Sequence, residues 1–418
     1  MKELLFLCHR IPYPPNKGDK IRSFNMLRHL ASRHVVHLGA FVDDPDDWQH
    51  APVLRRLCGS VELVPLPRRQ ALLRSATGLL TGEPLGLPYY RNQQLQRWCE
   101  QRMSGPRPAD GILVFSSTMA QYALDYGGVP RVLDLCDVDS DKWRQYAQRR
   151  RWPMSWVYRR EAALLEQCER EYARRFDAVL LVSEAEAALF RQIAPESAAR
   201  ILALRNGVDT VFFDPALVQP TPFAPDQQAV VFTGAMDYWA NVDAVEWFAR
   251  EVLPSIRQRC AQAHFWIVGS HPAEAVQRLA RLPGVSVTGS VPDVRPYLGH
   301  AQLVVAPLRV ARGIQNKVLE ALSMARPVVA SSAALDGLEA GSGAHVPGTR
   351  RADQPAEFAD AVTQILSATA PLDAAAGRRY VCERYGWQAS LATFDRLFAA
   401  ETVAAAIPEL PAVQLGRS

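Results

Sequence analysis

The sequence predicts an α/β protein built from two Rossmann-like, doubly wound domains. The chain has 418 residues, which is more than one ordinary core organises and suits two domains. Short apolar runs alternate with longer stretches of helical period in each half, and this alternation is typical of a parallel sheet covered by helices. The proline-rich segment 213–228 interrupts the alternation, so we expect it to link the two domains.

The expected elements follow from these runs in chain order. In the N-terminal half, apolar runs bounded by polar or turn residues predict strands at 3–8, 35–42, 111–115, 131–135 and 178–182, and helical periodicity predicts helices at 20–32 and, as one long helix, 141–175. In the C-terminal half, the same criteria predict strands at 229–233, 263–268, 285–287, 302–306 and 327–330, and an amphipathic helix near 387–400. The expected domains are 1–215 and 216–385, followed by a last helix at 386–400 and an Ala/Pro-rich mobile tail at 401–418.

Composition excludes several classes of protein. The chain is 48% hydrophobic and 22% charged, and it holds no apolar run near the roughly 18 residues of a membrane span, so we expect a cytoplasmic globular protein. Its seven cysteines form no Cys-x-x-Cys pair, which argues against a disulfide framework and a zinc site. The net charge of +4 comes from the N-terminal half and is too weak to predict nucleic-acid binding, whereas an anionic membrane surface is a candidate partner.

The segment 307–329 carries the most informative chemistry. A strand is expected to end at Ala306 and a helix to begin near Ile314, where free backbone N–H groups favour a phosphate. Lys317 adds positive charge, and Glu320 shares its helix face three residues later, so one side chain can meet a diphosphate while the other accepts ribose hydroxyls. An ordinary surface salt bridge between the two is an equally good interpretation of the spacing. The expected donor contacts of this segment are Arg309, Gly313, Ile314, Gln315, Asn316, Lys317 and Glu320.

This segment resembles the donor-binding signature of the family-four retaining glycosyltransferases of GT-B fold. The usual signature has two glutamates, and Glu320 matches the second, whereas Arg312 stands where the first would fall. A subset of that family has the same Pro-Leu-Arg start and the same lysine three residues before the glutamate, and the form seen here is most similar to sugar transferases of PEP-CTERM/exosortase exopolysaccharide clusters. Three further segments resemble the family in the correct order and add Ser183, Asn206, Gly234 and Asn241 as expected donor-binding residues.

The resemblance implies two domains that face each other across a cleft, with the last helix returning to the N-terminal domain. It also implies transfer with retention of configuration and a glycine near the reacting sugar, which matches Gly18 in the loop after the first strand. A proline-stiffened surface turn is the alternative interpretation of that loop. The family often has a His-Asp pair after a later strand, and here Cys136 stands in the histidine position, so Asp137 is the remaining candidate to orient a hydroxyl group.

Two interpretations of the segment 133–140 stay open. We expect Ser140 to cap the following helix and Asp137 to act in the site. Alternatively, Asp137 and Asp139 form the Asp-x-Asp motif of a GT-A transferase and hold a divalent metal. Because Lys317, Arg309 and a helix end already offer positive charge to the donor, we expect no metal and no cofactor.

A basic and aromatic segment lies at 142–160. It contains seven basic and five aromatic residues, among them Trp152 and Trp156, a mixture that suits an anionic bilayer surface. A solvated helix face with its aromatic residues in the core explains the pattern equally well.

Taken together, these patterns and the resemblance predict a glycosyltransferase. The expected donor is a nucleotide sugar, and the expected acceptor is a hydroxyl group of a lipid-linked or growing polysaccharide intermediate of exopolysaccharide synthesis. A non-catalytic nucleotide-sugar-binding or scaffold protein and a nucleotide-sugar epimerase remain as alternatives.

Overall fold

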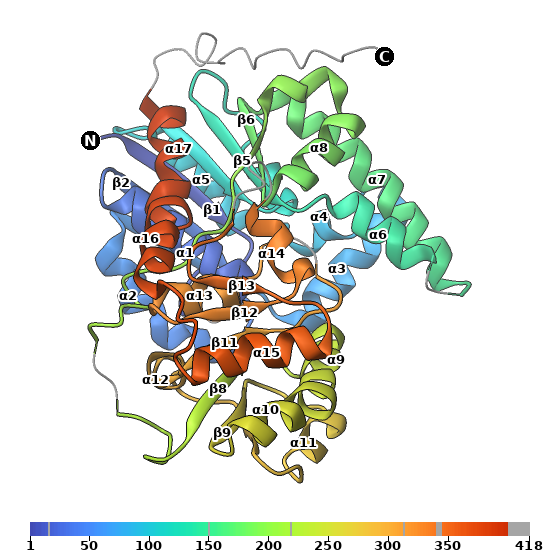
Figure 1. Ribbon diagram of the computed structural model, residues 1–418. Helices are drawn as coiled ribbons and strands as arrows, with labels where there is room; N and C mark the ends of the chain where they lie inside the picture. Colours follow the sequence, from blue (N-terminus) through green and yellow to red (C-terminus); the bar gives the residue numbers. More distant parts are fainter. Residues whose placement is uncertain (16, 149–150, 218–219, 312–313, 340–344, 400–418) are drawn as a thin grey trace, which may run out of the picture. The chain divides into compact units, whose positions relative to one another are not determined.

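The computed structural model contains two compact α/β units (Figure 1). The structure describes residues 1–15, 17–148, 151–217, 220–311, 314–339 and 345–399, so the expected tail at 401–418 lies outside the described residues. The first unit holds Met1–Asn206 and the described residues from Leu391 onward, and the second holds Gly207–Ser390. The division falls ahead of the expected boundary at 215, because the backbone N–H of Val208 donates to the carbonyl of Tyr385 in the second unit.

The first unit is built on a parallel sheet of the order β3-β2-β1-β4-β5-β6-β7. Strand β1 lies in its middle, and Phe6 pairs with Leu38 of β2 and with Leu113 of β4. Apart from its first residue, β1 is completely buried, which explains why its sequence is apolar rather than alternating. The strands are β1 Glu3–Cys8, β2 Val35–Val42, β3 Ser60–Pro65, β4 Gly111–Phe115, β5 Arg131–Cys136, β6 Ala178–Leu181 and β7 Ile201–Ala203.

The helices of the first unit connect these strands. They are α1 Gly18–Ala31, α2 Ala51–Leu57, α3 Arg68–Thr81, α4 Gly86–Tyr89, α5 Gln93–Ser104, α6 Asp139–Gln148, α7 Met154–Arg175 and α8 Glu184–Ile193, with short 3-10 turns at Pro45–His50, Ser117–Tyr122 and Pro195–Arg200. The single long helix expected at 141–175 is wrong, because α6 and α7 are separate and pack side by side as a hairpin (Figure 1). Pro153 stands immediately before α7, where a proline is tolerated, whereas inside a continuous helix it would remove a hydrogen bond.

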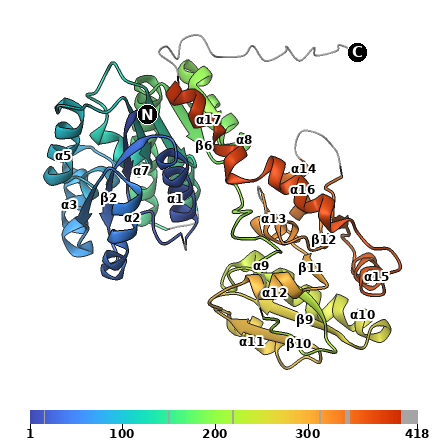
Figure 2. The same cartoon turned by 90° about the vertical axis from the view of Figure 1, so that its left-hand side faces the viewer.

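The second unit repeats the architecture with a parallel sheet of the order β10-β9-β8-β11-β12-β13 (Figure 2). Its strands are β8 Gln228–Thr233, β9 Ala263–Val268, β10 Val285–Gly289, β11 Leu303–Ala306, β12 Val328–Ala330 and β13 Thr349–Arg351. Its helices are α9 Trp239–Trp247, a π-helical turn Phe248–Val252, α10 Leu253–Arg259, α11 Glu274–Leu279, α12 Arg295–His300, α13 Asn316–Ser323, α14 Ser332–Glu339, α15 Pro355–Leu366 and α16 Ala374–Arg384. Each unit has its own hydrophobic core.

The last helix, α17 Trp387–Ala399, joins the first unit from Leu391 onward. His29 Nε2 of α1 lies 3.1 Å from a carboxylate oxygen of Asp395, and Phe398 packs so close to Gly111 that a Cβ there would lie 2.9 Å from its ring. The described part of this helix therefore packs against the first unit, as expected for a returning helix. Within the described ranges, none of the helices combines the length and the apolar character needed to cross a membrane.

Both strand orders reverse direction beside the first strand of the unit. This switch lies between β1 and β4 in the first sheet and between β8 and β11 in the second. In open parallel sheets, ligands bind outside the carboxyl ends of the strands at such a switch point. These two strand ends are therefore the places to look for binding sites in each unit.

Candidate functional site

A polar cluster lies at the carboxyl end of β8 in the second unit. The Lys317 ammonium of α13 donates a 2.6 Å hydrogen bond to Oδ1 of Asn241 on α9. The amide nitrogen of Asn241 in turn donates to the carbonyl of Ala235 at 2.9 Å, which holds the asparagine in one orientation. Lys317 Nζ also lies 4.2 Å from the ring centroid of Phe232, a favourable cation–π contact. The structure thus brings together Lys317, Asn241 and the loop that begins at Gly234, all three of which the sequence predicts.

Two glycines make room for this cluster. A Cβ on Gly234 would lie 2.7 Å from the Asn241 amide nitrogen and 3.4 Å from Lys317 Nζ. A Cβ on Gly269, at the end of β9, would lie only 1.6 Å from the Gly234 carbonyl oxygen, which no side chain can do. Gly269 was missed by sequence reasoning, because nothing near it in the chain indicates that β8 and β9 approach so closely there.

Helix α13 presents two ionisable groups with opposed pKa shifts. Burial lowers the pKa of Lys317 to about 8, and the neighbouring Glu320 carboxylate opposes this shift. Burial raises the pKa of Glu320 to about 7, with Lys317 opposing. A half-buried ammonium and carboxylate are partly deprived of water, and an anionic group placed beside Lys317 would favour its charged form. The pair is therefore poised near neutral pH, which is typical of functional sites.

The other expected donor residues of the second unit behave differently. Arg309 is largely exposed and forms an ion pair with Asp243 of α9, so its charge is already offset within the protein. Ile314 packs against the hydrophobic core, and Gln315 and Asn316 form the start of α13, the positive end of its helix dipole. Gly313 and Arg312 lie outside the described residues. Lys317, rather than Arg309, is therefore the better candidate for contact with a diphosphate.

Two expected donor residues belong to the first unit and already have structural partners there. Ser183 caps α8, accepting a hydrogen bond from the backbone N–H of Glu186 at 3.2 Å. Asn206 accepts a 2.8 Å hydrogen bond from Arg22, which is completely buried. Both side chains therefore have a structural role within the first unit.

Asp137 follows β5 and forms an ion pair with Lys142 of α6 at 2.7 Å. The Lys142 ammonium also lies 3.6 Å from a carboxylate oxygen of Asp139, so it occupies the position between the two acids. Burial raises the pKa of Asp139, although Lys142 opposes this. The Lys142 ammonium therefore occupies the place where a metal held by Asp137 and Asp139 would bind. This role of Lys142 was not predicted from the sequence.

The expected capping role of Ser140 is wrong. Its backbone N–H and its hydroxyl both donate to the buried carboxyl of Glu169 on α7, at 3.1 and 2.5 Å. Ser140 is itself the second residue of α6 and therefore lies inside the helix. It joins α6 to α7 instead of capping, because a partner 29 residues away satisfies its hydroxyl.

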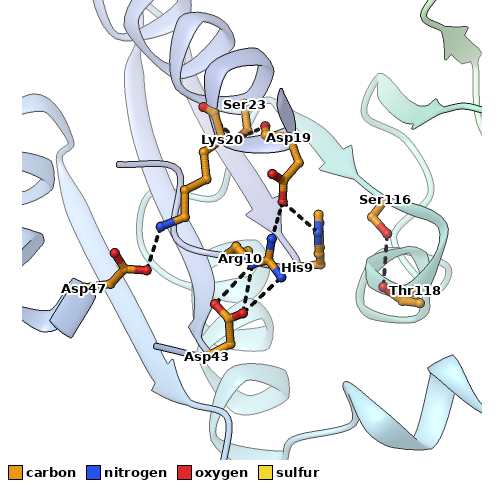
Figure 3. A network of polar contacts seen from close by, with 9 residues as sticks. All are labelled: His9, Arg10, Asp19, Lys20, Ser23, Asp43, Asp47, Ser116 and Thr118. Atoms are coloured by element: carbon orange, nitrogen blue, oxygen red, sulfur yellow. Dashed lines mark hydrogen bonds and ion pairs between the residues drawn. The ribbon is translucent and has the colours of Figure 1, made fainter. Parts of the chain in front are cut away.

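The carboxyl ends of β1 and β2 hold a further polar network that the sequence did not indicate (Figure 3). The Arg10 guanidinium lies between Asp19 and Asp43 and bonds both, at 2.7 and 3.0 Å, and His9 Nε2 lies 3.6 Å from Asp19 (Figure 3). Burial alone would raise the pKa of Asp19, yet the hydrogen bond from His9 and the Arg10 charge hold it well below its usual range. Lys20 makes a separate buried ion pair with Asp47 (Figure 3).

Gly18 begins α1 beside this network. A Cβ at this position would meet no described atom within 4 Å, so the surrounding protein itself does not require a glycine. Two other residues at the same edge of the sheet, Ser116 after β4 and Cys136 at the end of β5, have positive φ angles of 84° and 67°. Such backbone strain in residues other than glycine is concentrated at functional sites, and it here marks the strand ends that precede Thr118 and Asp137.

Comparison with known proteins places this geometry in context. Residues 227–368, about a third of the chain, match the family model described as glycosyl transferases group 1, and this segment contains Gly234, Asn241, Lys317 and Glu320. No curated protein sequence matches the chain significantly.

Solved structures resemble nearly the whole chain. HepE of Anabaena in complex with UDP superposes with a TM-score of 0.61 at 16% identity, over 96% of this chain and 100% of HepE. Sucrose-phosphate synthase of Thermosynechococcus elongatus gives 0.61 at 16% identity, over 95% and 98%. WaaG, a glycosyltransferase involved in lipopolysaccharide biosynthesis, gives 0.59 at 16% identity, over 95% and 100%.

These likenesses establish the fold, which is that of the GT-B glycosyltransferases, with two parallel-sheet Rossmann-like units. The family model adds that residues 227–368 of the second unit, which carry the Lys317 cluster, are similar to group 1 glycosyl transferases.

Proposed function

We propose that this chain transfers a glycosyl group from a nucleoside diphosphate sugar to a hydroxyl group of an acceptor. The observation that carries the proposal is the cluster of Gly234, Asn241, Lys317 and Glu320 at the carboxyl end of β8. It offers an ammonium, a helix start and a carboxylate within a single site. HepE, which has the same fold, was crystallised with UDP and with UDP-glucose, so a uridine nucleotide is the first donor to test.

In the proposed mechanism, the donor diphosphate binds at the start of α13. The Lys317 ammonium and the positive end of the α13 dipole stabilise the negative charge that grows on the leaving diphosphate as the bond between the sugar carbon and the diphosphate oxygen breaks. The Glu320 carboxylate accepts hydrogen bonds from donor hydroxyl groups, and ribose is the candidate. Asn241 holds Lys317 in place through its Oδ1, so it acts as a positioning residue.

The acceptor hydroxyl is proposed to bind at the first unit, where Asp137 is the candidate to orient it. Asp137 is half-buried at a strand end and is held by Lys142. The proposal has three further parts: transfer with retention of configuration, an exopolysaccharide intermediate as acceptor, and peripheral attachment at the cytoplasmic side of a membrane. The resemblance to family-four transferases supports the first two points, and the basic and aromatic segment 142–160 supports the third.

We further propose that transfer needs no metal. The Lys317 cation is covalently part of the site, and Lys142 already lies between Asp137 and Asp139. Turnover should therefore persist in excess EDTA. Loss of turnover with EDTA and its recovery with manganese would support the alternative in which these two aspartates hold a metal.

Thermal stabilisation by a panel of nucleotide sugars is the first test of the function. A donor present at 100 times its dissociation constant should add about 2.7 kcal/mol to the free energy of unfolding. At the same donor concentration, the variant Lys317→Met should lose at least about half of this stabilisation, whereas Lys2→Met, in the first unit, should keep it. If none of the nucleotide sugars raises the unfolding temperature of the wild type, donor binding is contradicted.

Incubation with the stabilising donor alone then separates the classes of activity. A transferase without acceptor releases sugar slowly to water, so free sugar and nucleotide should accumulate. A nucleotide sugar with an inverted carbon would instead identify an epimerase, and an unchanged donor would identify a binding protein. The anomeric configuration of the product, read by NMR with a sugar acceptor, tests retention.

A further inference from the structure

Helix α3 turns its apolar side chains outward. Leu73 and Leu80, seven residues apart and hence on one face, are 74% and 90% exposed, and Leu72 and Leu79 beside them are also exposed. The side of α3 that faces the protein carries small residues instead, since Ala71 and Gly78 are buried. A globular helix normally has the opposite arrangement, so this face is made for an apolar environment that the chain itself does not supply.

A second exposed apolar group lies at the start of α7. Trp152 is 80% exposed and Trp156 54%, with exposed Met154 between them in sequence. Side-chain hydrogen bonds tie this helix to the end of α3: Arg160 donates to the Gly78 carbonyl at 2.5 Å, and Glu161 accepts from the backbone N–H of Leu85 at 2.7 Å. Trp156 lies one helical turn before Arg160 on the same face of α7. The tryptophans and the leucines therefore belong to neighbouring parts of the same unit.

The charged side chains of the two stretches that form this surface are all basic, and the glutamates that follow them, Glu83 and Glu161, are paired with Arg91 and Arg160. Arg68 and Arg69 at the start of α3 are exposed, as are Arg151 and Arg159 on either side of the tryptophans. The stretches 66–82 and 142–160 contain no aspartate or glutamate. Exposed leucines and tryptophans surrounded by arginines match the interface of an anionic bilayer, where tryptophan rings sit at the headgroups and arginines meet lipid phosphates.

We propose that the exposed face of α3 and the start of α7, here called the leucine–tryptophan surface, insert into the headgroup layer of an anionic membrane. A second copy of the chain is the less favoured occupant, because a twofold contact would bring these arginines against the same arginines with no acid in either stretch to pair with them. A bilayer supplies both the apolar layer and the negative charge. This proposal rests on the peripheral attachment included in the proposed function and gives it a surface, which would place the first unit next to a lipid-linked acceptor. Its test measures binding alone and is independent of the transfer reaction.

Co-sedimentation of the full chain with vesicles tests the proposal, with no donor present. Vesicles of phosphatidylcholine mixed with phosphatidylglycerol should bind the chain, and the double variant Leu73→Gln/Leu80→Gln should bind at least about tenfold more weakly, since leucine side chains supply the apolar contact. Arg68→Gln/Arg69→Gln should lose about 30-fold on these vesicles, at about 1 kcal/mol for each arginine near an anionic surface, and should lose much of its dependence on salt.

Matched variants in the second unit provide the controls. Val211→Gln removes an apolar side chain that is 74% exposed, like Leu73, and Arg281→Gln removes an exposed arginine, and both should bind like the wild type. Far-UV circular dichroism checks the fold of each variant. Equal binding by the leucine variant and the wild type would overturn the proposal. So would a wild type that ignores vesicles and forms a dimer in light scattering that the leucine variant abolishes. Donor-induced thermal stabilisation should be unchanged in every one of these variants, which keeps this test apart from that of the transfer function.

Discussion

Lys317 Nζ lies 2.6 Å from Oδ1 of Asn241, although 76 residues separate the two in the chain. The contact joins α13 to α9 across the carboxyl ends of β8 and β11, the switch point of the second sheet. The asparagine amide is neutral, so it orients the ammonium without cancelling its charge. The lysine therefore keeps its electrostatic effect for a ligand, whereas Arg309 is already paired with Asp243.

Donor affinity should have a maximum between about pH 7 and pH 8. Lys317 has a lowered pKa of about 8, so above that pH the free protein loses the ammonium, and affinity for a diphosphate should fall by up to tenfold per pH unit. Glu320 has a raised pKa of about 7, so below that pH its carboxylate is protonated and accepts fewer hydroxyl groups. Titration calorimetry across this range measures both limbs of the pH profile, the acidic one set by Glu320 and the alkaline one set by Lys317.

The variant Lys317→Arg serves as the control for the alkaline limb. Arginine stays charged at every pH in question, so its alkaline limb should disappear while the acidic limb remains. Lys317→Met should lower affinity roughly ten- to a hundredfold at neutral pH, the usual worth of a charge-assisted hydrogen bond. An alkaline limb that persists in the arginine variant would show that another group titrates there.

Glu320→Gln should weaken donor binding by about tenfold while leaving the fold at least as stable as the wild type at pH 8. Its pKa rises from 4.5 in the unfolded chain to about 7 in the fold, so the ionised carboxylate costs stability above pH 4.5, and the cost reaches its full size above pH 7. An amide does not ionise and avoids this cost. Differential scanning calorimetry and donor titration give the two readouts.

Glu274→Gln, on an exposed position of α11, is the matched control for this prediction. Its side chain is 84% exposed, so neither stability nor donor affinity should change. If Glu320→Gln keeps wild-type donor affinity, Glu320 does not contact the donor, and the raised pKa reflects burial alone.

Gly234→Ala should weaken donor binding through Asn241. The new Cβ would lie 2.7 Å from the asparagine amide, so that side chain must move and release Lys317. Asn241→Ala should have a similar effect, and the double variant should lose little more than either single one, because both changes remove the same restraint. Gly299→Ala on α12 is the control, since its Cβ would meet only the flexible end of Met324. Additive losses in the double variant would contradict this coupling.

Most strands were predictable from the sequence, and the reason is burial. Runs such as 4–8 and 111–115 are apolar throughout because their strands are covered on both faces. Strands β3, β7 and β13 were missed; all three are edge strands that are less buried than the central strands, and β13 contains two arginines. In the site, Lys317 and Glu320 were found from their spacing on one helix. Partners distant in sequence, such as Asp243 for Arg309 and Glu169 for Ser140, leave no local pattern and were missed.

The buried ion pair of Arg22 and Asp134 should be the main polar support of the first unit. Both side chains are almost fully buried, and Arg22 donates to Asp134 at 2.7 Å, to the Leu204 carbonyl at 2.7 Å and to Asn206 at 2.8 Å. These bonds join α1 to β5 and to the chain after β7, so they also fix the helix that carries Asp19 and the network around Arg10. Removing the arginine leaves a buried carboxylate without its counter-charge.

Arg22→Met should lower the free energy of unfolding of the first unit by about 3–5 kcal/mol. Burial raises the pKa of Asp134, and Arg22 opposes that rise, so the pKa climbs further in the variant. A carboxyl whose pKa is raised by folding destabilises the fold less as the pH falls toward its pKa in the unfolded chain. The loss in free energy of unfolding caused by Arg22→Met should therefore shrink at acidic pH. Arg22→Met/Asp134→Asn should recover part of the loss at neutral pH, because the amide carries no charge and its oxygen can still accept from the backbone N–H of Cys136.

Urea denaturation followed by circular dichroism measures the wild type and both variants. Arg91→Met is the control for an exposed ion pair, where a loss of less than about 1 kcal/mol is expected. A loss in Arg22→Met no larger than that of Arg91→Met, or one independent of pH, would mean that the chain around β5 relaxes to let water reach Asp134.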